Sequence, residues 1–310
     1  MKSTGTGKNR AKAGSGKRVF LTGATGFIGL HVLEALFRSG YDISALYRNE
    51  KKIPRELRFH QKIEWVEGEF TDFTSWKDRI SGHDIIINCV GIIREKKGST
   101  FQVVHADIPG HMMNEAVHAK ASHFIQISAL GAGVDNSIRY FYTKKEAEDF
   151  LIQSGVRYTI FRPSFVFSYY SEAMRLFRKL ALMLLTPVIG GGNYKFQPIF
   201  AGDLAQVVCE SIHNKKSWNK IIEVGGPEVL TYKEILKTLA KVENKSITTL
   251  SIPFWMALPG VILGQNFEFF PITVDQLKML VRGSVCSNNL MQETFSIQTT
   301  SFEQGLRISK

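Results

Sequence analysis

Two residues of this sequence, Tyr140 and Lys144, have the side-chain types and the spacing for proton transfer. Residues four positions apart on a helix share one face. A tyrosine can give or take a proton at a carbonyl or an alcohol while hydride moves. Its unperturbed pKa is about 10, and a neighbouring ammonium favours the phenolate. Ser128, which ends the preceding predicted strand, is placed to hydrogen-bond a substrate oxygen, so we predict catalytic roles for all three.

Other interpretations of this helix stay open. An ordinary amphipathic helix over residues 140–152 would show the same spacing without any catalytic role. The neighbouring register pairs Phe141 with Lys145, which offers no acid, and Tyr142 has only Glu146 four residues on. The helix alone therefore does not show whether Tyr140 and Lys144 are catalytic, and the interpretation depends on the motifs that precede it in the chain.

Three glycines near the start of the chain predict a dinucleotide site. An apolar run ending at Leu21 leads into Gly23, Gly26 and Gly29, and an apolar segment of helical period follows, over 28–37. In this strand–turn–helix context the glycines allow a tight turn, close approach of a pyrophosphate and helix–strand packing. The helix N-terminus attracts phosphate. A ligand-free glycine turn is the alternative. We assign nucleotide contacts to the stretch Thr22, Gly23, Thr25, Gly26, Phe27, Ile28 and Gly29.

The predicted second strand, over 42–47, bears on the choice of nucleotide. In such folds its carboxyl end lies at the adenosine ribose, where an acid suits a free 2′-hydroxyl and an arginine suits a 2′-phosphate. Arg48 stands there, with no acid before Glu50. The sequence therefore favours NADP(H) over NAD(H). The alternative is a surface arginine that opens a basic loop with Lys51 and Lys52.

Repeated strand–helix units predict an α/β fold, a Rossmann-type doubly wound parallel sheet with a smaller C-terminal lobe. The further strands are predicted over 62–67, 83–88, 122–128, 155–162 and 220–224, and helices over 101–119 and from 139. Ligands bind at the carboxyl ends of such strands. The fourth strand ends in small and polar residues, and we assign nucleotide contacts to Asn88, Val90 and Gly91.

The chain divides into three predicted parts. Residues 1–17 form a disordered basic tail, 18–165 the dinucleotide-binding core and 166–310 a mixed C-terminal part. Within the last part, a strand and a helix near 220–242 return to the core, while 166–200 and 245–305 form a substrate or partner lobe. Thr231 is predicted to cap the helix over 232–242, with Glu234 completing a capping box.

Composition excludes several functional classes. The net charge of +11 suggests nucleic-acid binding, but six basic side chains lie in residues 1–18 without an acid, so the remainder carries only +5. The three cysteines lie far apart and indicate a reducing compartment. The histidines show no metal-ligand spacing and are interpreted as scattered helix and loop residues. The apolar stretches 180–189 and 252–263 are shorter than the ~20 residues of a spanning helix, and are interpreted as core or as surfaces that lie on a bilayer.

A series of short motifs resembles the short-chain dehydrogenase/reductase superfamily, in its extended or atypical branch that includes nucleoside-diphosphate-sugar epimerases. The chain looks closest to the group around the NADP(H)-holding accessory subunit of respiratory complex I and its bacterial relatives. The resemblance covers about residues 18–285. Besides the glycine turn and the Tyr140 and Lys144 pair, its motifs are Asn-Cys-Val-Gly at 88–91, Ile-Ser-Ala-Leu-Gly-Ala at 127–132, Phe-Arg-Pro-Ser at 161–164, Phe-Gln-Pro-Ile at 196–199, Gly-Gly-Pro-Glu-Val-Leu-Thr-Tyr at 225–232 and Asp-Gln-Leu-Lys-Met-Leu at 275–280.

The resemblance implies roles for single residues. It places Arg48 at the 2′-phosphate, Glu69 and Phe70 near adenine, Lys144 at both the nucleotide and the reaction, and Pro163 near the nicotinamide. Two residues depart from the family pattern, because Glu69 stands where an Asp is usual and Ser168 where many relatives have glycine. Some members of the group hold the nucleotide structurally, so an intact Tyr/Lys pair permits catalysis without demonstrating it.

Two functions follow as expectations. One is an NADP(H)-dependent oxidoreductase or epimerase acting on an unidentified alcohol, carbonyl or quinone. The other is a non-catalytic, nucleotide-holding subunit or assembly factor of a respiratory NADH:quinone oxidoreductase complex, with peripheral membrane association. The expected location is the cytoplasm in a bacterium, or the matrix side of the mitochondrial inner membrane in a eukaryote. Nucleic acid is not expected as a partner.

Overall fold

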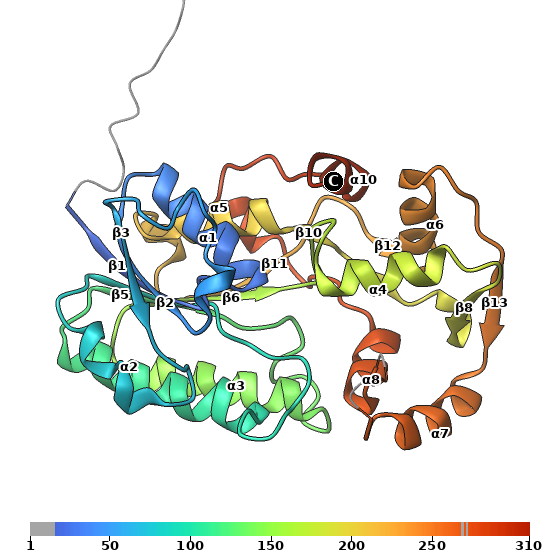
Figure 1. Ribbon diagram of the computed structural model, residues 1–310, viewed down its shortest axis with the longest axis horizontal. Coiled ribbons are helices and arrows are strands. Elements are labelled where there is room, and N and C mark those ends of the chain that lie inside the picture. Colours follow the sequence, from blue (N-terminus) through green and yellow to red (C-terminus); the bar gives the residue numbers. More distant parts are fainter. Residues whose placement is uncertain (1–15, 268–269, 271) are drawn as a thin grey trace, which may run out of the picture.

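A seven-stranded parallel sheet forms the centre of the molecule (Figure 1). The computed structural model describes residues 16–267, 270 and 272–310, so most of the predicted basic tail lies outside the described residues. The strand order is β11-β6-β5-β4-β1-β2-β3. Starting from β1, the chain adds β2 and β3 on one side and then β4, β5 and β6 on the other, which is the predicted Rossmann arrangement. The strands are β1 (Arg18–Thr22), β2 (Asp42–Tyr47), β3 (Ile63–Glu67), β4 (Ile85–Asn88), β5 (His123–Ile127), β6 (Tyr158–Pro163) and β11 (Lys220–Val224).

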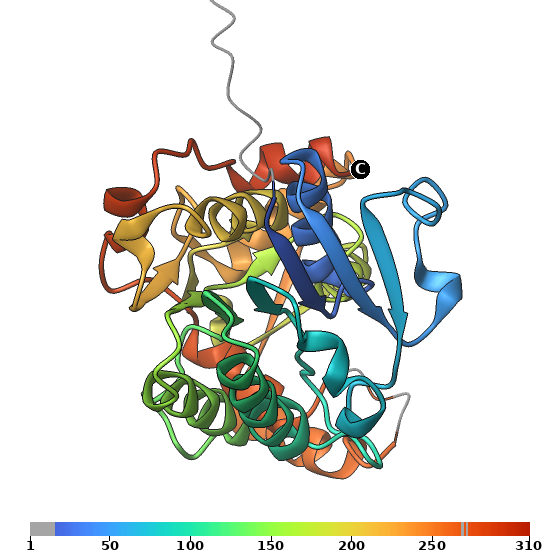
Figure 2. The same ribbon diagram turned by 90° about the vertical axis from the view of Figure 1, so that its left-hand side faces the viewer.

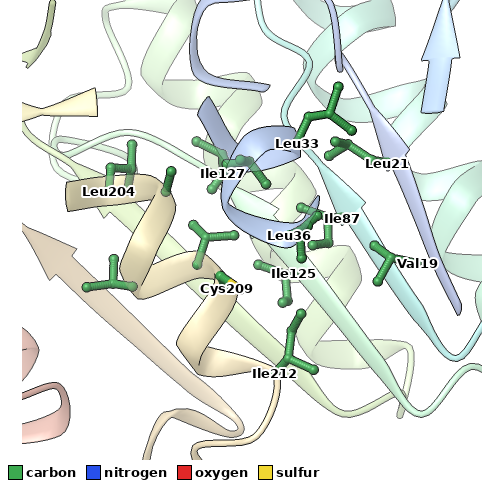
Figure 3. Packing of buried hydrophobic residues seen from close by; sticks show 14 of the residues in the cluster. Val19, Leu21, Leu33, Leu36, Ile87, Ile125, Ile127, Leu204, Cys209 and Ile212 are labelled. Carbon is green, nitrogen blue, oxygen red and sulfur yellow. The ribbon is translucent and has the colours of Figure 1, made fainter. Parts of the chain in front are cut away.

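Helices cover both faces of the sheet because successive residues of each buried strand point to opposite sides. Val19 and Leu21 of β1 pack in one cluster with α1 (Phe27–Arg38) and α5 (Ala201–Ser211), as Figure 3 shows. Phe20 belongs to the other cluster, with α2 (Ile108–His118) and α3 (Arg139–Gln153). Figure 2 shows these two layers from the side. The apolar runs of the sequence are therefore buried on both faces.

The C-terminal part builds a smaller lobe beyond the carboxyl ends of β6 and β11, on the right in Figure 1. It has its own apolar cluster, in which α4, α6 and α10 meet. Its elements are β7 (Val166–Phe167), α4 (Glu172–Ala181), β8 (Thr186–Ile189), β9 (Lys195–Phe196), β10 (Ile199–Phe200), β12 (Leu230–Thr231), α6 (Tyr232–Val242), β13 (Thr249–Ile252), α7 (Phe254–Gly264), α8 (Val274–Arg282) and α10 (Phe302–Ile308). Helix α6 therefore packs in the lobe and not, as predicted, on the core, whereas α9 (Leu290–Thr294) packs on β11 of the central sheet.

Local signals in the sequence locate several elements well. Strand β11 and helix α6 have their predicted bounds, and the Thr231–Glu234 capping box is formed. Helix α4 begins after Ser171, whose hydroxyl caps it, and ends at Ala181. Among the described residues, no helix has the length and apolarity needed to cross a membrane.

The helix predicted over 101–119 is not uniform. Its first part, Gln102–Asp107 (η4), is a π-helix, and α2 continues from Ile108. Pro109 lacks the N–H that an α-helix needs at this point, and a wider turn accommodates the missing bond. This π-turn carries His105 into the buried interior.

Candidate functional site

The glycine turn between β1 and α1 is closely packed, and each of its glycines has a steric reason. Gly23 has φ +75°, and a Cβ there would lie 3.0 Å from the backbone carbon of Cys89. A Cβ on Gly29 would lie 2.0 Å from the Gly23 carbonyl oxygen, and one on Gly26 would lie 3.1 Å from the same atom. The first turn of α1 therefore rests directly on the turn that precedes it.

The N-terminus of α1 is open to an anion. Gly26 is its N-cap, no side chain among the described residues caps the helix, and no acid stands in its first turn. The first amides of the helix consequently have no side-chain partner, and the positive end of the helix dipole is uncompensated. Phe27 is 37% exposed here, and Thr25 and Ile28 are half-buried. This cradle fits the pyrophosphate of a dinucleotide.

Polar side chains link three strand ends behind the glycine turn. The Thr22 hydroxyl donates to Asn88 Oδ1 at 2.7 Å, and the Val90 amide donates to the same oxygen at 3.1 Å. Asn88 Nδ2 in turn donates to Gln126 Oε1 at 3.1 Å. The predicted residues Thr22, Asn88 and Val90 thus join one buried network that holds the ends of β1, β4 and β5 in register.

The residues predicted at the adenosine end come from neighbouring strands. Arg48 follows β2 and Glu69 follows β3, and they form an ion pair at 3.4 Å in which the arginine side chain is 64% exposed. Phe70 is buried and stacks on Trp76 with ring centroids 5.8 Å apart. The Phe70 side chain therefore belongs to the core, while Arg48 and Glu69 both face the carboxyl edge of the sheet.

Tyr140 and Lys144 lie on α3 as predicted, but their chemical states differ from the expectation. Burial raises the pKa of Tyr140 to about 12, so the phenol holds its proton at neutral pH. Lys144 is buried and its Nζ donates to the Ile127 carbonyl at 3.1 Å. Burial lowers the pKa of Lys144 to about 8, against the charge of Glu148. Burial of the phenol, and not the nearby ammonium, sets its proton affinity.

The Ser128 hydroxyl is engaged with a buried carboxylate and not with the position expected for a substrate oxygen. Its hydroxyl donates to Glu148 Oε1 at 2.5 Å. Glu148 is fully buried and receives the Arg162 guanidinium on both oxygens, with the Nε bond 2.9 Å long. An ionised carboxylate only accepts hydrogen bonds. The serine proton is therefore directed to Glu148, and in this state Ser128 has no proton to offer a substrate oxygen.

His105 belongs to this site, although the sequence-based interpretation treated it as scattered. Its Nε2 accepts the Ile92 amide at 3.1 Å, and its Nδ1 lies 3.1 Å from Thr143 Oγ1. Thr143 donates its own proton to the Arg139 carbonyl, so Nδ1 is the donor. Burial and the Lys144 charge lower the pKa of His105 to about 2, which keeps the ring neutral. Its edge packs on Tyr140 with centroids 5.2 Å apart.

The ends of β4, β5 and β6 converge on this cluster. A Cβ on Gly91 would lie 3.2 Å from Lys144 Nζ, so glycine lets the loop after β4 approach the lysine. Pro163 ends β6, where it is buried, and its carbonyl accepts the Leu130 amide at 2.9 Å. The predicted residues of the nicotinamide end therefore surround Lys144 and the end of β5.

Sequence reasoning missed four members of the site: His105, Gln126, Glu148 and Arg162. One of them had a signal, because Glu148 stands four residues after Lys144 and so shares its helix face. Arg162 lies in the Phe-Arg-Pro-Ser motif but had no assigned partner. Nothing in the local sequence indicates the His105 contacts, since they depend on the π-turn.

Two distant motifs of the resemblance pack against each other below the site. Gln197 Nε2 donates to the Gly226 carbonyl at 2.9 Å, and Gln197 Oε1 accepts the Cys286 amide. A Cβ on Gly226 would lie 1.9 Å from the Pro198 carbonyl oxygen. The glycine pair is thus required by the close approach of the Phe-Gln-Pro-Ile segment, and the contact joins the lobe to the sheet.

A family model described as NAD(P)H-binding matches residues 23–175, which include the glycine turn, Tyr140, Lys144 and Pro163. This part of the chain is similar to known NAD(P)H-binding domains. The cradle at α1 lies within the part that this model matches, and the predicted resemblance to the dehydrogenase/reductase superfamily is confirmed.

The chain is similar over most of its length to two mitochondrial proteins and to a solved epimerase structure. The chain is 26% identical over 306 residues to mitochondrial NADH dehydrogenase [ubiquinone] 1 alpha subcomplex subunit 9 of Arabidopsis thaliana, covering 93% of this chain and 75% of that protein. It is 23% identical to the Rattus norvegicus protein of the same name, covering 96% and 80%. UDP-glucuronic acid 4-epimerase from Bacillus cereus, solved with UDP-glucuronic acid and NAD, has the same fold, with TM-score 0.74, 16% identity and coverage of 94% and 97%.

Proposed function

We propose that the protein binds NADP(H) and transfers hydride between the nicotinamide and an alcohol or carbonyl group. The observation that carries this proposal is the placement of Lys144 beside Gly91, at the carboxyl edge of the sheet near the glycine turn, with Tyr140 on the same helix packed on His105. When hydride adds to a carbonyl carbon, a side chain must give a proton to the carbonyl oxygen, and in the reverse reaction it takes the proton from the alcohol. The bound nucleotide supplies the hydride, and the protein supplies the proton and the orientation.

The side chains have distinct proposed tasks. Tyr140, whose pKa is raised to about 12, acts as a phenol that gives its proton to a carbonyl oxygen. Lys144 holds the nucleotide at the Gly91 loop and keeps positive charge near the phenol. His105, neutral and bonded on both nitrogens, fixes α3 against the loop after β4. Reduction of a carbonyl is the direction that a protonated tyrosine favours.

Replacing Tyr140 tests this reaction. In Tyr140→Phe, turnover of NADPH with a panel of aldehydes, ketones and quinones should fall by about 10²-fold or more, while NADPH affinity stays unchanged. Tyr142→Phe is the matched control, because Tyr142 lies on the same helix and is 45% exposed. Turnover that survives in Tyr140→Phe would remove the proposed role of Tyr140.

The preference for NADP(H) is a separate proposal. Arg48 is supported by Lys51 and Lys52 in the same loop, and its ion pair with Glu69 is exposed and so exchanges readily for a phosphate. In Arg48→Gln, NADPH should bind at least about tenfold more weakly, as expected when a charge-assisted hydrogen bond is lost, while NADH affinity stays constant. Tighter binding of NADH than of NADPH by the wild-type protein would contradict the preference.

A second function, a nucleotide-holding subunit or assembly factor of a respiratory complex, is favoured by Ser128. Its proton is bound to Glu148, so the set Ser128, Tyr140 and Lys144 lacks one donor for a substrate oxygen. The Arabidopsis and rat relatives are named as subunits of NADH dehydrogenase. This role would place the protein at the matrix face of the mitochondrial inner membrane, or at the cytoplasmic face of a bacterial membrane.

The two functions are separated by one pair of measurements on the purified protein. Nucleotide released on denaturation is identified, and the substrate panel is then tested for any change in its reduction state. A tightly held nucleotide whose reduction state never changes, together with co-purifying respiratory subunits, supports the holding role. Turnover that depends on Tyr140 supports the enzyme.

A further inference from the structure

A cavity of about 300 Å³ opens in the C-terminal lobe, away from the nucleotide site. Its lining comes from α4 and from the end of α6, namely Arg175, Arg178, Lys179, Leu182 and Glu243. None of these residues has a part in the nucleotide site or in the proposed reaction. Three of the five side chains are cationic, so the cavity suits an anion.

The single carboxylate of the cavity is already shared. Glu243 lies 3.6 Å from Arg178 and 3.2 Å from the Lys310 ammonium, and it accepts the Tyr169 hydroxyl at 2.5 Å. The hydrogen bond from Tyr169, which has the largest effect, and the interactions with Lys310 and Arg178 lower the pKa of Glu243 and keep it ionised. The Arg178 guanidinium also stacks on the Tyr169 ring, 3.8 Å from its centroid. Glu243 therefore balances Arg178 and Lys310 and has little charge left for the other two cations.

Arg175 and Lys179 carry that surplus of positive charge. They stand four residues apart on α4, so their side chains share the helix face that lines the cavity. Neither has a carboxylate within 4.0 Å in the part of the chain that the structure describes. Arg178, by contrast, is engaged by Glu243 and by the Tyr169 ring. The cavity thus presents two charges, those of Arg175 and Lys179, that no carboxylate of the described residues compensates.

An exposed apolar rim continues from the cavity wall. We define the rim as residues 182–185 and Leu250. Leu182 ends the cavity lining, and Leu182, Met183, Leu184 and Leu185 are 51%, 51%, 93% and 50% exposed. Strand β8 starts at Thr186. Leu250 of the neighbouring strand β13 lies opposite Pro187 of β8 and is 51% exposed. Beyond β13, helix α7 exposes Trp255 and Leu263 on the same lobe.

We propose that this cavity and rim bind an acidic phospholipid at a bilayer surface. The lipid phosphate enters the cavity between Arg175 and Lys179, and the rim leucines insert at the boundary between headgroups and acyl chains. Apolar insertion and attraction to anionic lipid each give weak binding, and together they give stable association. Four consecutive exposed apolar residues beside uncompensated cations have this complementarity. The inference goes beyond the nucleotide-linked function, because it uses none of that site.

Sedimentation with lipid vesicles tests the proposal on the full chain. The wild-type protein should bind vesicles of equal parts phosphatidylcholine and phosphatidylglycerol and leave pure phosphatidylcholine vesicles unbound. Arg175→Gln/Lys179→Gln should weaken binding about 25-fold, since each basic side chain at an anionic surface contributes about fivefold. Leu184→Ser should weaken it about tenfold through lost apolar burial. All three side chains are exposed, so the fold should tolerate the changes, and thermal unfolding checks this.

A matched control removes two charges elsewhere. Lys216→Gln/Lys220→Gln replaces two exposed lysines outside the lobe, and it should bind vesicles within about twofold of the wild type. Every variant retains the basic residues 1–17, so their attraction to vesicles is common to all. Equal binding by the Arg175/Lys179 variant and the wild type would overturn the proposal, and so would equal losses in the two charge variants. An unaffected Leu184→Ser variant, with inorganic phosphate displacing the vesicles, would show an anion site without lipid insertion and would also overturn it.

Discussion

Gly29→Ala is the sharpest test of the glycine turn, because the structure gives the overlap directly. A Cβ on Gly29 would lie 2.0 Å from the Gly23 carbonyl oxygen, whereas ordinary contacts begin at 3.4 Å. The start of α1 must therefore move by about 1.4 Å away from the turn. Overpacking of this kind costs about 1–3 kcal/mol. The gain of helix propensity offsets about 1 kcal/mol of this cost, so we expect a net loss of about 0–2 kcal/mol.

The same displacement should weaken nucleotide binding more than it weakens the fold. The helix amides and the Gly23 turn must point at one pyrophosphate, and loss of one charge-assisted hydrogen bond costs about 1.5–3 kcal/mol. We expect NADPH affinity to fall at least about tenfold in a fluorescence titration, together with a lower thermal midpoint. Gly260→Ala in α7 is the control, because its Cβ meets nothing within 4 Å, so it should raise stability slightly and leave affinity unchanged. Wild-type affinity in Gly29→Ala would refute the steric reasoning.

Two further predictions concern the buried charges beside the site. Glu148→Gln leaves the Arg162 guanidinium buried without its anion, so the free energy of unfolding measured in urea should fall by about 3–5 kcal/mol. Glu303→Gln is the control: it removes exposed ion pairs and should keep the wild-type midpoint. Equal midpoints in both variants would contradict the burial assigned to the Glu148–Arg162 pair. Lys144 has its pKa lowered from 10.5 to about 8, so between these values the unfolded chain holds more protons and the free energy of unfolding rises with pH. Tyr140 acts in the opposite direction above pH 10, because its pKa is raised to about 12. From pH 8 to pH 10 the stability of the wild type relative to Lys144→Met should therefore rise by about 2 kcal/mol, and parallel pH profiles would show that Lys144 is not desolvated as described.

Much of the fold could be predicted from local patterns. The glycine turn, the strands and the capping box at Thr231 each depend on residues within a few positions of one another, and the structure has them where they were predicted. Burial of β1 on both faces follows from its uninterrupted apolar run. The π-turn at His105 could not be placed from the helical pattern, because the apolar period continues through it.

The site was predictable only in part, for the same reason. The sequence by itself determined that a nucleotide cradle exists and that Tyr140 and Lys144 share a helix face. Tertiary structure alone decided where the Ser128 proton goes, since Glu148 on α3 accepts it from the end of β5, 20 residues away in the chain. It also decided the neutral state of His105 and the protonated state of Tyr140, because burial depends on how distant elements pack. Local spacing sets which side chains share a face, and the low-dielectric surroundings created by folding set which proton each one keeps.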